Sequence, residues 1–306
     1  MSLPDPPVVV VLGPTATGKS ALGLFLAERL GGEIVNADAL QVYRGLDIGT
    51  AKPTAEERAR VPHHLVDVIE PSERFSAGEF ARRARAAITG IRARGRRPVV
   101  VGGSGLYLRA LLEGISPIPP GDHEVRRRLL GRLEGEGLAT LHEELRRRDP
   151  ATAARLLPGD GQRILRALEV VESSGTPLSE WIARRPYGRE RLRAVRLGLT
   201  LPRALLYDAI ERRVARMVER GWVEEVRRLL SRGLSPAAPA FQAIGYRQLA
   251  RHAVGDWSLE RAQEETVGAT RRFAKRQQTW FRKEPDILWL DAREVEREPA
   301  TVIELC

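Results

Sequence analysis

The chain has 306 residues, and its 50 lysine and arginine residues outnumber the 40 aspartate and glutamate residues, which gives a net charge of +10. This excess favours a polyanionic partner, with nucleic acid as the first candidate, although a mildly basic solvated surface is the simpler alternative. The single cysteine, Cys306, excludes an intrachain disulfide and a cysteine-rich metal site. No apolar run reaches the roughly 18 residues of a membrane-spanning helix, and no basic segment precedes an apolar one at the start. We therefore expect a cytoplasmic protein without signal peptide or membrane contact.

The first chemical motif is a glycine-rich loop between a predicted strand and a predicted helix. An apolar run at residues 8–12 precedes the loop, and a helical pattern at 21–30 follows it. The spacing G-x-x-x-x-G-K-S is that of a phosphate-binding loop. Loop amides and the helix N-terminus would face phosphate oxygens, while Lys19 adds a mobile charge and Ser20 offers a hydroxyl to Mg²⁺. The loop consists of Gly13, Pro14, Thr15, Ala16, Thr17, Gly18, Lys19 and Ser20.

The order of apolar and helical segments predicts a parallel α/β fold with an insertion. The predicted strands are residues 8–12, 33–36, 64–68, 99–101, 195–199 and 286–290. The predicted helices outside the insertion are residues 21–30, 76–94, 204–220, 223–232 and 258–282. A break rich in proline at 117–121 is followed by an all-helical pattern. We therefore predict a P-loop NTPase-like parallel sheet flanked by helices in residues 1–116 and 193–306, with an inserted all-helical subdomain in residues 117–192.

Two further motifs follow predicted strands. Asp38 lies just past the second strand, and the turn Gly-Gly-Ser-Gly-Leu-Tyr at residues 102–107 follows the fourth. In open α/β sheets the ligand site lies at the carboxyl ends of the strands, so Asp38 should face the phosphate-binding loop. There it could hold Mg²⁺ or accept a proton from a nucleophile. A helix N-cap is the alternative role for this carboxylate.

Seven segments, in the same order and over nearly the whole chain, resemble the tRNA dimethylallyltransferases (tRNA isopentenyltransferases). The two most specific are D-A-L-Q-V-Y-R-G-L-D-I-G-T-A-K-P at residues 38–53 and K-R-Q-Q-T-W at residues 275–280. The other five are residues 13–20, 63–67, 102–107, 162–170 and 243–247. Three positions depart from the family pattern: Ser20 and Ser104 stand where threonine is common, and Ala39 stands where serine is common.

The resemblance implies a prenyl transfer to tRNA. The dimethylallyl group of dimethylallyl diphosphate would move to the exocyclic amine of the adenosine 3′-adjacent to the anticodon, in tRNAs that read codons beginning with U. The phosphate-binding loop, which is usually a nucleotide or ATP-binding site, would hold the diphosphate leaving group with Mg²⁺. Asp38 would be the general base, with Lys19 and Arg213 on the diphosphate. The protein would act as a monomer.

The resemblance also implies the residues that contact tRNA, with the insertion as the domain that recognises the anticodon stem-loop. Single positions in this set are Ser104 and Arg126. Two segments from the core are Asp38, Ala39, Leu40 and Gln41, and Gln242, Ala243, Ile244, Gly245, Tyr246 and Arg247. A segment from the insertion is Gln162, Arg163, Ile164, Leu165 and Arg166. The last segment is Lys275, Arg276, Gln277, Gln278, Thr279, Trp280, Phe281 and Arg282.

Residue chemistry near the C-terminus supports an RNA partner independently. Residues 266–283 contain six basic side chains and no acidic ones, interleaved with Phe273, Trp280 and Phe281. Such a mixture suits an RNA strand, whose phosphates take up the cations and whose bases stack on aromatic rings. The alternative is an ordinary amphipathic helix whose aromatic residues anchor it in the core. The arginines at 126–128 and 146–148 could likewise bind RNA, or they could form ordinary ion pairs on a helix surface with nearby glutamates.

Two other functional classes fit part of the pattern. A small-molecule kinase would also use the phosphate-binding loop and Asp38, with ATP and an alcohol as substrates. The helical insertion and the basic C-terminal segment argue against it, and also against a transferase that acts on free adenine nucleotides. A non-catalytic RNA-binding protein would not need the intact Gly18, Lys19 and Ser20.

Overall fold

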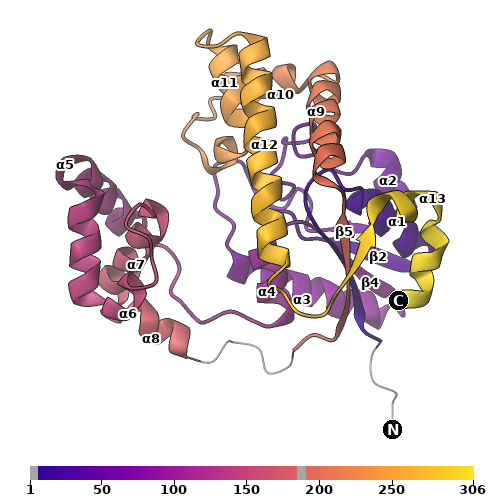
Figure 1. Cartoon of the computed structure of the whole chain (residues 1–306), viewed down its shortest axis with the longest axis horizontal. Coiled ribbons are helices and arrows are strands. Elements are labelled where there is room, and N and C mark those ends of the chain that lie inside the picture. Colours follow the sequence, from indigo (N-terminus) through magenta and orange to yellow (C-terminus); the bar gives the residue numbers. More distant parts are fainter. Residues whose placement is uncertain (1–5, 185–190) are drawn as a thin grey trace. The chain divides into compact units, whose positions relative to one another are not determined.

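The computed structural model describes residues 6–184 and 191–306 (Figure 1). Its main unit contains a six-stranded sheet in which all paired strands are parallel, in the order β3-β2-β4-β1-β5-β6. The strands are β1 (Val8–Leu12), β2 (Gly32–Asn36), β3 (His63–His64), β4 (Arg97–Val101), β5 (Ala194–Thr200) and β6 (Ile287–Asp291). The predicted fold class, a parallel sheet flanked by helices, is confirmed.

All five helices predicted outside the insertion are present, and their ends lie within two residues of the prediction. They are α1 (Lys19–Arg29), α3 (Ala77–Ala93), α9 (Arg203–Glu219), α10 (Trp222–Ser231) and α12 (Leu259–Phe281). Shorter helices complete the unit: α2 (Ala55–Arg60), α4 (Gly105–Leu112), α11 (Tyr246–Ala253), α13 (Ala292–Arg297) and the 3₁₀ helices η1 (Pro239–Gln242) and η2 (Pro299–Leu305). In the part of the chain that the structure describes, no helix has the length and apolar character needed to span a bilayer.

Helices cover both faces of the sheet because the strands are apolar on both sides. Successive residues of a strand point to opposite faces. Val8 and Val10 pack in a core with α3 and α4, whereas Val9 and Val11 pack in a second core with α1 and the segment from α13 to η2 (Figure 1). All four valines are fully buried. A strand buried on both faces reads as a continuous run of β-branched residues, as residues 8–11 do.

A third core lies around Trp222, at the start of α10. Its indole ring is buried and meets the ring of Tyr246 edge-on, with centroids 5.6 Å apart. The ring also lies against two glycines from distant parts of the chain. A Cβ atom on Gly49 would lie 2.0 Å from the indole Nε1, and one on Gly245 would lie 1.9 Å from the ring. The close approach of the indole therefore requires glycine at both positions.

The predicted strand at residues 64–68 is wrong beyond its first residue. β3 ends at His64, because Leu65 and Asp67 both adopt positive φ angles, 63° and 57°, which a strand does not allow. Contacts outside the segment hold this turn: the side-chain amide of Asn36 donates to the Leu65 carbonyl at 3.0 Å. Asp67 pairs with Lys52 at 2.6 Å.

The helical unit comprises Glu113–Glu190, so it begins four residues before the predicted boundary of 117 and ends two residues before 192. Its helices are α5 (His123–Arg148), α6 (Pro150–Ala153), α7 (Gly161–Ser174) and α8 (Leu178–Ala183). Leu129, Leu141, Leu145 and Leu168 form its core. α5 is kinked at Gly137, where φ is 80° and ψ is 161°.

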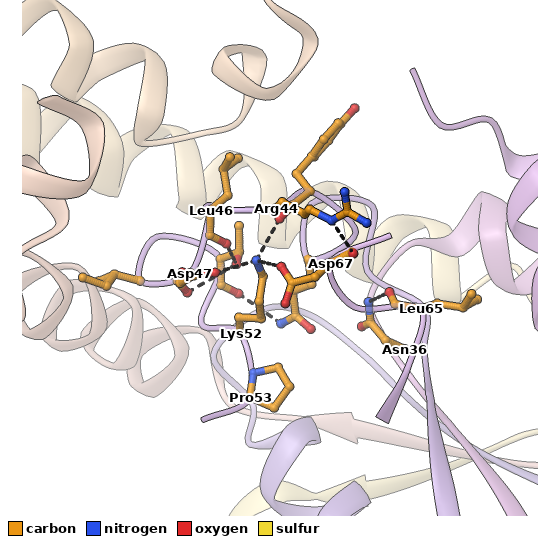
Figure 2. A network of polar contacts seen from close by, with 12 residues as sticks. Asn36, Arg44, Leu46, Asp47, Lys52, Pro53, Leu65 and Asp67 are labelled. Atoms are coloured by element: carbon orange, nitrogen blue, oxygen red, sulfur yellow. Dashed lines mark hydrogen bonds and ion pairs between the residues drawn. The ribbon is translucent and has the colours of Figure 1, made fainter. Parts of the chain in front are cut away.

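A buried ammonium group organises the loop that follows β2 (Figure 2). The side chain of Lys52 is only 2% exposed. Its Nζ donates to Asp47 Oδ1 and Asp67 Oδ1, both at 2.6 Å, and to the Tyr43 carbonyl at 2.8 Å. Burial alone would raise the pKa of Asp67, but hydrogen bonds from Lys52 and Arg58 outweigh it and lower the pKa. Lys52 therefore joins the loop at 43–47 to the turn after β3.

We predict that Lys52→Met lowers the free energy of unfolding by about 3–5 kcal/mol, because it removes one partner of a buried ion pair and leaves the other desolvated. Arg227→Met is the matched control. Its guanidinium pairs with Glu224 at the surface at 3.5 Å, where both side chains are more than half exposed, and such pairs contribute about 0–1 kcal/mol. Urea unfolding of the two variants measures the difference. Equal stabilities for both variants would contradict a structural role for the buried ammonium.

Candidate active site

The loop between β1 and α1 adopts the backbone conformation that its glycines predicted. Gly13 has φ 136° and Gly18 has φ 84°, both in the region where glycine is favoured. A side chain at Gly13 would also collide with the backbone, because a Cβ atom there would lie 2.4 Å from the Leu199 carbonyl oxygen. The loop therefore packs closely on the end of β5, and its conformation depends on these two residues.

The first turn of α1 is free of side-chain caps. Gly18 is the N-cap residue and offers no side chain to the first backbone amides of the helix. Within the loop, Thr17 Oγ1 and Lys19 Nζ both donate to the Pro14 carbonyl, at 2.9 and 2.5 Å. The amides at the helix N-terminus thus remain available to an anion, whose charge the helix dipole also favours.

Two cations lie near one carboxylate at this loop. Burial, and next the charge of Arg213, lower the pKa of Lys19 to about 7, and Asp38 opposes the shift. Burial likewise lowers the pKa of Arg213, again against the effect of Asp38. Arg213 makes no hydrogen bond or ion pair with any residue that the structure describes. The loop and α9 therefore bring together two poorly solvated basic groups, whose charged forms a bound anion would stabilise.

The depressed pKa of Lys19 has a consequence for stability. Between pH of about 7 and the usual Lys value of 10.5, the folded protein binds fewer protons at this group than the unfolded chain does. The group therefore destabilises the ligand-free fold at neutral pH, and this penalty falls as the pH rises through that range. A bound anion would reverse the effect, because it favours the charged ammonium.

The turn after β2 fixes Asp38 through backbone contacts. Asp38 Oδ1 accepts a hydrogen bond from the Leu40 amide at 2.8 Å, and the Asp38 amide donates to the side chain of Asn36 at 3.2 Å. The Ala39 amide donates to Ser104 Oγ at 3.1 Å. No helix begins at this turn, so the alternative of a helix N-cap is wrong. The carboxylate is held in place and half-buried.

A cavity of about 650 Å³ opens beside Asp38. Its volume lies within the range of small-molecule sites, and apolar and aromatic groups form most of its wall. The indole N–H groups of Trp222 and Trp280 are buried and have no hydrogen-bond partner among the described residues, and each lies against a glycine, Gly49 and Gly105 respectively. Aromatic and polar side chains of the wall include those of Tyr107, Trp222, Trp280, Asp38, Ser104 and Arg213.

The loop at Ser20 can contribute to a magnesium site but cannot form one by itself. The Ser20 residue is exposed at the first turn of α1. In residues 6–184 and 191–306, no three His, Cys, Asp or Glu side chains are grouped so that they could hold a metal ion. This donor set fits Mg²⁺, which proteins commonly bind through substrate phosphates and only one or two side chains.

The predicted tRNA-contact segments of the main unit divide into exposed and buried side chains. In α12 and the residue after it, Lys275, Arg276, Thr279 and Arg282 are exposed, Gln278 and Trp280 are half-buried, and Gln277 and Phe281 are buried. Between η1 and α11, Gln242 and Arg247 are exposed and Ile244 is half-buried, whereas Ala243, Gly245 and Tyr246 are buried. After Asp38, Ala39 and Leu40 line the cavity, and Gln41 donates to the carbonyls of Thr50 and Ala51. The buried members contribute packing, so only the exposed and cavity-lining members can present side chains to a ligand.

The predicted contacts in the helical unit show the same division. Ile164 and Leu165 of the predicted tRNA-contact segment are buried in the core of this unit, so their side chains contribute packing and only the exposed members of the segment can present side chains to RNA. Arg126 and Arg166 share the buried Glu169, at 3.5 and 3.3 Å. Gln162 is exposed, and Arg163 pairs with Asp160 in the same turn of helix.

Two residues that build the site were not among the predicted site residues. Asn36 positions the turn of Asp38, and Trp222 forms part of the cavity wall. Asn36 is the last residue of β2, two positions before Asp38. A polar residue at that strand end could have indicated from the sequence that it contacts the turn of Asp38. Nothing in the local sequence of Trp222 distinguishes it from a core anchor.

We predict that binding of inorganic diphosphate at about pH 8 takes up roughly one proton at Lys19, because the ammonium is largely neutral in the free protein and the anion restores its charge. Calorimetry in buffers of different ionisation enthalpy measures this uptake. Lys19→Met should remove it, whereas Lys283→Met, at an exposed position near the end of α12, should retain it. The same uptake in wild type and Lys19→Met would show that another group is responsible.

Comparison with known proteins places these features in a family. The IPP transferase family model matches residues 41–284. The tRNA dimethylallyltransferase of Geobacter metallireducens is 51% identical over 284 residues, which cover 93% of this chain and 92% of that protein. The tRNA dimethylallyltransferase of Syntrophobacter fumaroxidans is 49% identical and covers 98% of this chain and 87% of its own length.

Solved structures agree with the sequence comparison. The crystal structure of a full-length tRNA isopentenylpyrophosphate transferase from Bacillus halodurans aligns with a TM-score of 0.68 and 38% identity, over 98% of this chain and 97% of that one. A eukaryotic dimethylallyltransferase acting on tRNA aligns with a TM-score of 0.80 and 29% identity, over 96% of this chain and 76% of that one. The family match, the identity of about one half over nearly the full length, and the shared fold show that this chain belongs to the IPP transferase family.

Proposed function

We propose that this protein is a tRNA dimethylallyltransferase. It transfers the dimethylallyl group from dimethylallyl diphosphate to the exocyclic amine of the adenosine 3′-adjacent to the anticodon, in tRNAs that read codons beginning with U, and releases diphosphate. The observation that carries the proposal is that Asp38 and Arg213 line a largely apolar cavity, while Lys19 of the glycine-rich loop lies close enough to interact electrostatically with both. The names of its relatives support the same reaction.

The cationic end of the site suits a diphosphate leaving group. When the bond between the allylic carbon and the diphosphate oxygen breaks, negative charge grows on the diphosphate. Lys19, Arg213 and the uncapped amides of α1 are fixed where they can stabilise that charge. The apolar wall of the cavity suits the hydrocarbon group and limits the access of water to the reacting carbon.

Asp38 suits the role of general base. As the adenine nitrogen forms its bond to the allylic carbon, the amine becomes positively charged and must release a proton. The Leu40 amide holds one carboxylate oxygen of Asp38, which leaves the other oxygen available to accept that proton. The adenine must leave its stack in the anticodon loop to reach this carboxylate, as bases do in other enzymes that modify them.

We further propose Mg²⁺ as the cofactor. The hydroxyl of Ser20 and the oxygens of the diphosphate would hold it. When bound, the ion would supply additional charge stabilisation for the leaving group. We also propose that the protein acts as a monomer in the cytoplasm, a compartment whose reducing conditions suit the single free thiol of Cys306.

The side of the molecule that carries α12 suits an RNA backbone. Arg272, Lys275 and Arg282 are exposed and form no ion pair with any described residue. The arginines of the helical unit differ, because glutamates neutralise several of them: Arg132 pairs with Glu136 at 2.8 Å and with Glu144 at 2.7 Å. α12 therefore offers more uncompensated charge to phosphates than α5 does.

Wild-type protein should transfer label from radiolabelled dimethylallyl diphosphate to unmodified tRNA, and should not label tRNA that lacks the target adenosine. Asp38→Asn should lower kcat by about 10²-fold or more, because the amide keeps the shape but cannot accept a proton. Its affinity for inorganic diphosphate should change little. Asp208→Asn, at an exposed position on α9, is the control and should keep wild-type turnover. Near-normal turnover of Asp38→Asn would assign the base to another group.

Thermal protection by ligands, together with the labelling assay, separates this proposal from a kinase. A small-molecule kinase would use the same loop and carboxylate, but ATP would protect it against heat more strongly than dimethylallyl diphosphate at equal concentration. Stronger protection by ATP, together with no labelling of tRNA, would favour the kinase.

We predict that tRNA affinity falls steeply with salt concentration, with a log–log slope of about −0.7 for each single-stranded phosphate that the protein neutralises. Arg276→Gln and Arg282→Gln should each reduce the slope by up to about one contact. The control is Arg60→Gln, because Arg60 already pairs with Glu28 through two hydrogen bonds at 2.7 and 2.9 Å. Filter binding over a salt series measures the slopes. Slopes unchanged by both α12 substitutions would exclude this helix as the phosphate-binding surface.

A further inference from the structure

Gln277 stands apart from its neighbours on α12. Gln277 is only 7% exposed, whereas Lys275 and Arg276, which directly precede it, are exposed. Both ends of its side-chain amide are bonded to backbone. Oε1 accepts from the amide of Thr15 at 2.8 Å, and Nε2 donates to the carbonyl of Gly103 at 2.9 Å. One side chain thus joins the phosphate-binding loop to the loop that follows β4.

The loop after β4 in turn contacts the turn that carries Asp38. Ser104 Oγ accepts from the Ala39 amide at 3.1 Å, and the Ser104 amide lies 3.4 Å from the Ala37 carbonyl that it donates to. The contact is close, because a Cβ atom on Gly102 would lie 2.2 Å from that same carbonyl oxygen. A continuous set of contacts therefore runs from Thr15 through Gln277 and Gly103 to Asp38.

The side chain of Gln277 packs so closely on Gly103 that no side chain fits at position 103. A Cβ atom there would lie 2.4 Å from Gln277 Nε2. Thr15, Gly103, Gln277 and Asp38 all line the same cavity. The amide of Gln277 therefore forms part of the wall between the diphosphate end of the cavity and the carboxylate, although it carries no charge and does not titrate.

We propose that Gln277 is a positioning residue that fixes the distance between the phosphate-binding loop and Asp38. This inference rests on the proposed function, in which the loop holds the leaving group and Asp38 accepts the proton. Transfer needs the allylic carbon, the adenine amine and the carboxylate aligned, and a misplacement of about 1 Å can lower the rate by 10²-fold. Gln277 acts through Thr15 and Gly103, because both ends of its side-chain amide are already bonded to their backbone groups.

The test uses Gln277→Met, which keeps the size of the side chain but removes both hydrogen bonds. We expect kcat to fall by about 10- to 100-fold, whereas KM for dimethylallyl diphosphate and for tRNA should stay within about 3-fold, because the binding groups remain in place. Gln263→Ala, on the same helix at a position outside the cavity, is the control and should keep the wild-type kcat. A wild-type kcat for folded Gln277→Met, or a loss confined to KM, would overturn the proposal.

A double-mutant cycle tests the linkage by a second route. Ser104→Ala removes the hydroxyl at the other end of the set of contacts and leaves the core intact. If both residues act through one linkage, the double variant should lose much less kcat than the product of the two single losses, because either break already frees the loops from each other. Losses that multiply independently would overturn the proposal.

Failure of the positioning role proposed for Gln277 can be distinguished from failure of the proposed transferase function. Absence of transfer by wild-type protein would contradict the proposed function. Amide hydrogen exchange would then test whether Gln277 links the phosphate-binding loop to the loop after β4. The residues of the phosphate-binding loop should exchange faster in Gln277→Met than in wild type or Gln263→Ala, because the Thr15 amide has lost its acceptor. Equal exchange in all three proteins would overturn the linkage itself.

Discussion

Parallel pairing of β1, β2, β4 and β5 brings the ends of four strands to one edge of the sheet, and each end supplies a different part of the site. The phosphate-binding loop follows β1, Asp38 follows β2, and the glycines that approach both of them follow β4. β5 leads into α9, which carries Arg213. These groups come from positions almost 200 residues apart in the chain, but the register of one sheet fixes their spacing. A side chain on any one strand end can therefore be placed accurately only if all four strands are paired correctly.

The same edge concentrates positive charge that the protein leaves unneutralised. Burial, and next the charge of Arg213, lower the pKa of Lys19, and Asp38 offsets only part of this effect. Elsewhere the chain treats buried charge differently. Lys52 is surrounded by Asp47, Asp67 and a carbonyl, so its charge is fully compensated. The contrast separates a cation that stabilises the fold from cations whose partner must arrive from solution.

Much of this arrangement could be predicted from local sequence. Loop spacing alone predicted the glycine-rich turn between β1 and α1, and the position of Asp38 after an apolar run predicted that it follows the neighbouring part of the same sheet. Contacts between distant residues decided the rest. The turn at Leu65 depends on Asn36, so the pattern of β-branched residues at 64–68 wrongly predicted a strand. Gln277 lies in a basic helix and was predicted to face RNA with its neighbours. Its burial depends on Thr15, 262 residues away, and no local pattern reports that contact. Ile164 and Leu165 were assigned as a segment, although helical periodicity turns both side chains into the core.

The packing of Trp222 against two glycines also restricts how the family can vary. Because the indole fills the space of a side chain at both Gly49 and Gly245, neither glycine can gain a methyl group while the tryptophan remains. A smaller residue at 222 would make space for a side chain at position 49, but it would leave a void beside the cavity wall. Position 245 would still require glycine, because its φ of 90° strains any other residue. Viable relatives should therefore keep Gly245 throughout and should replace Gly49 only together with Trp222, even though the two glycines belong to loops 196 positions apart.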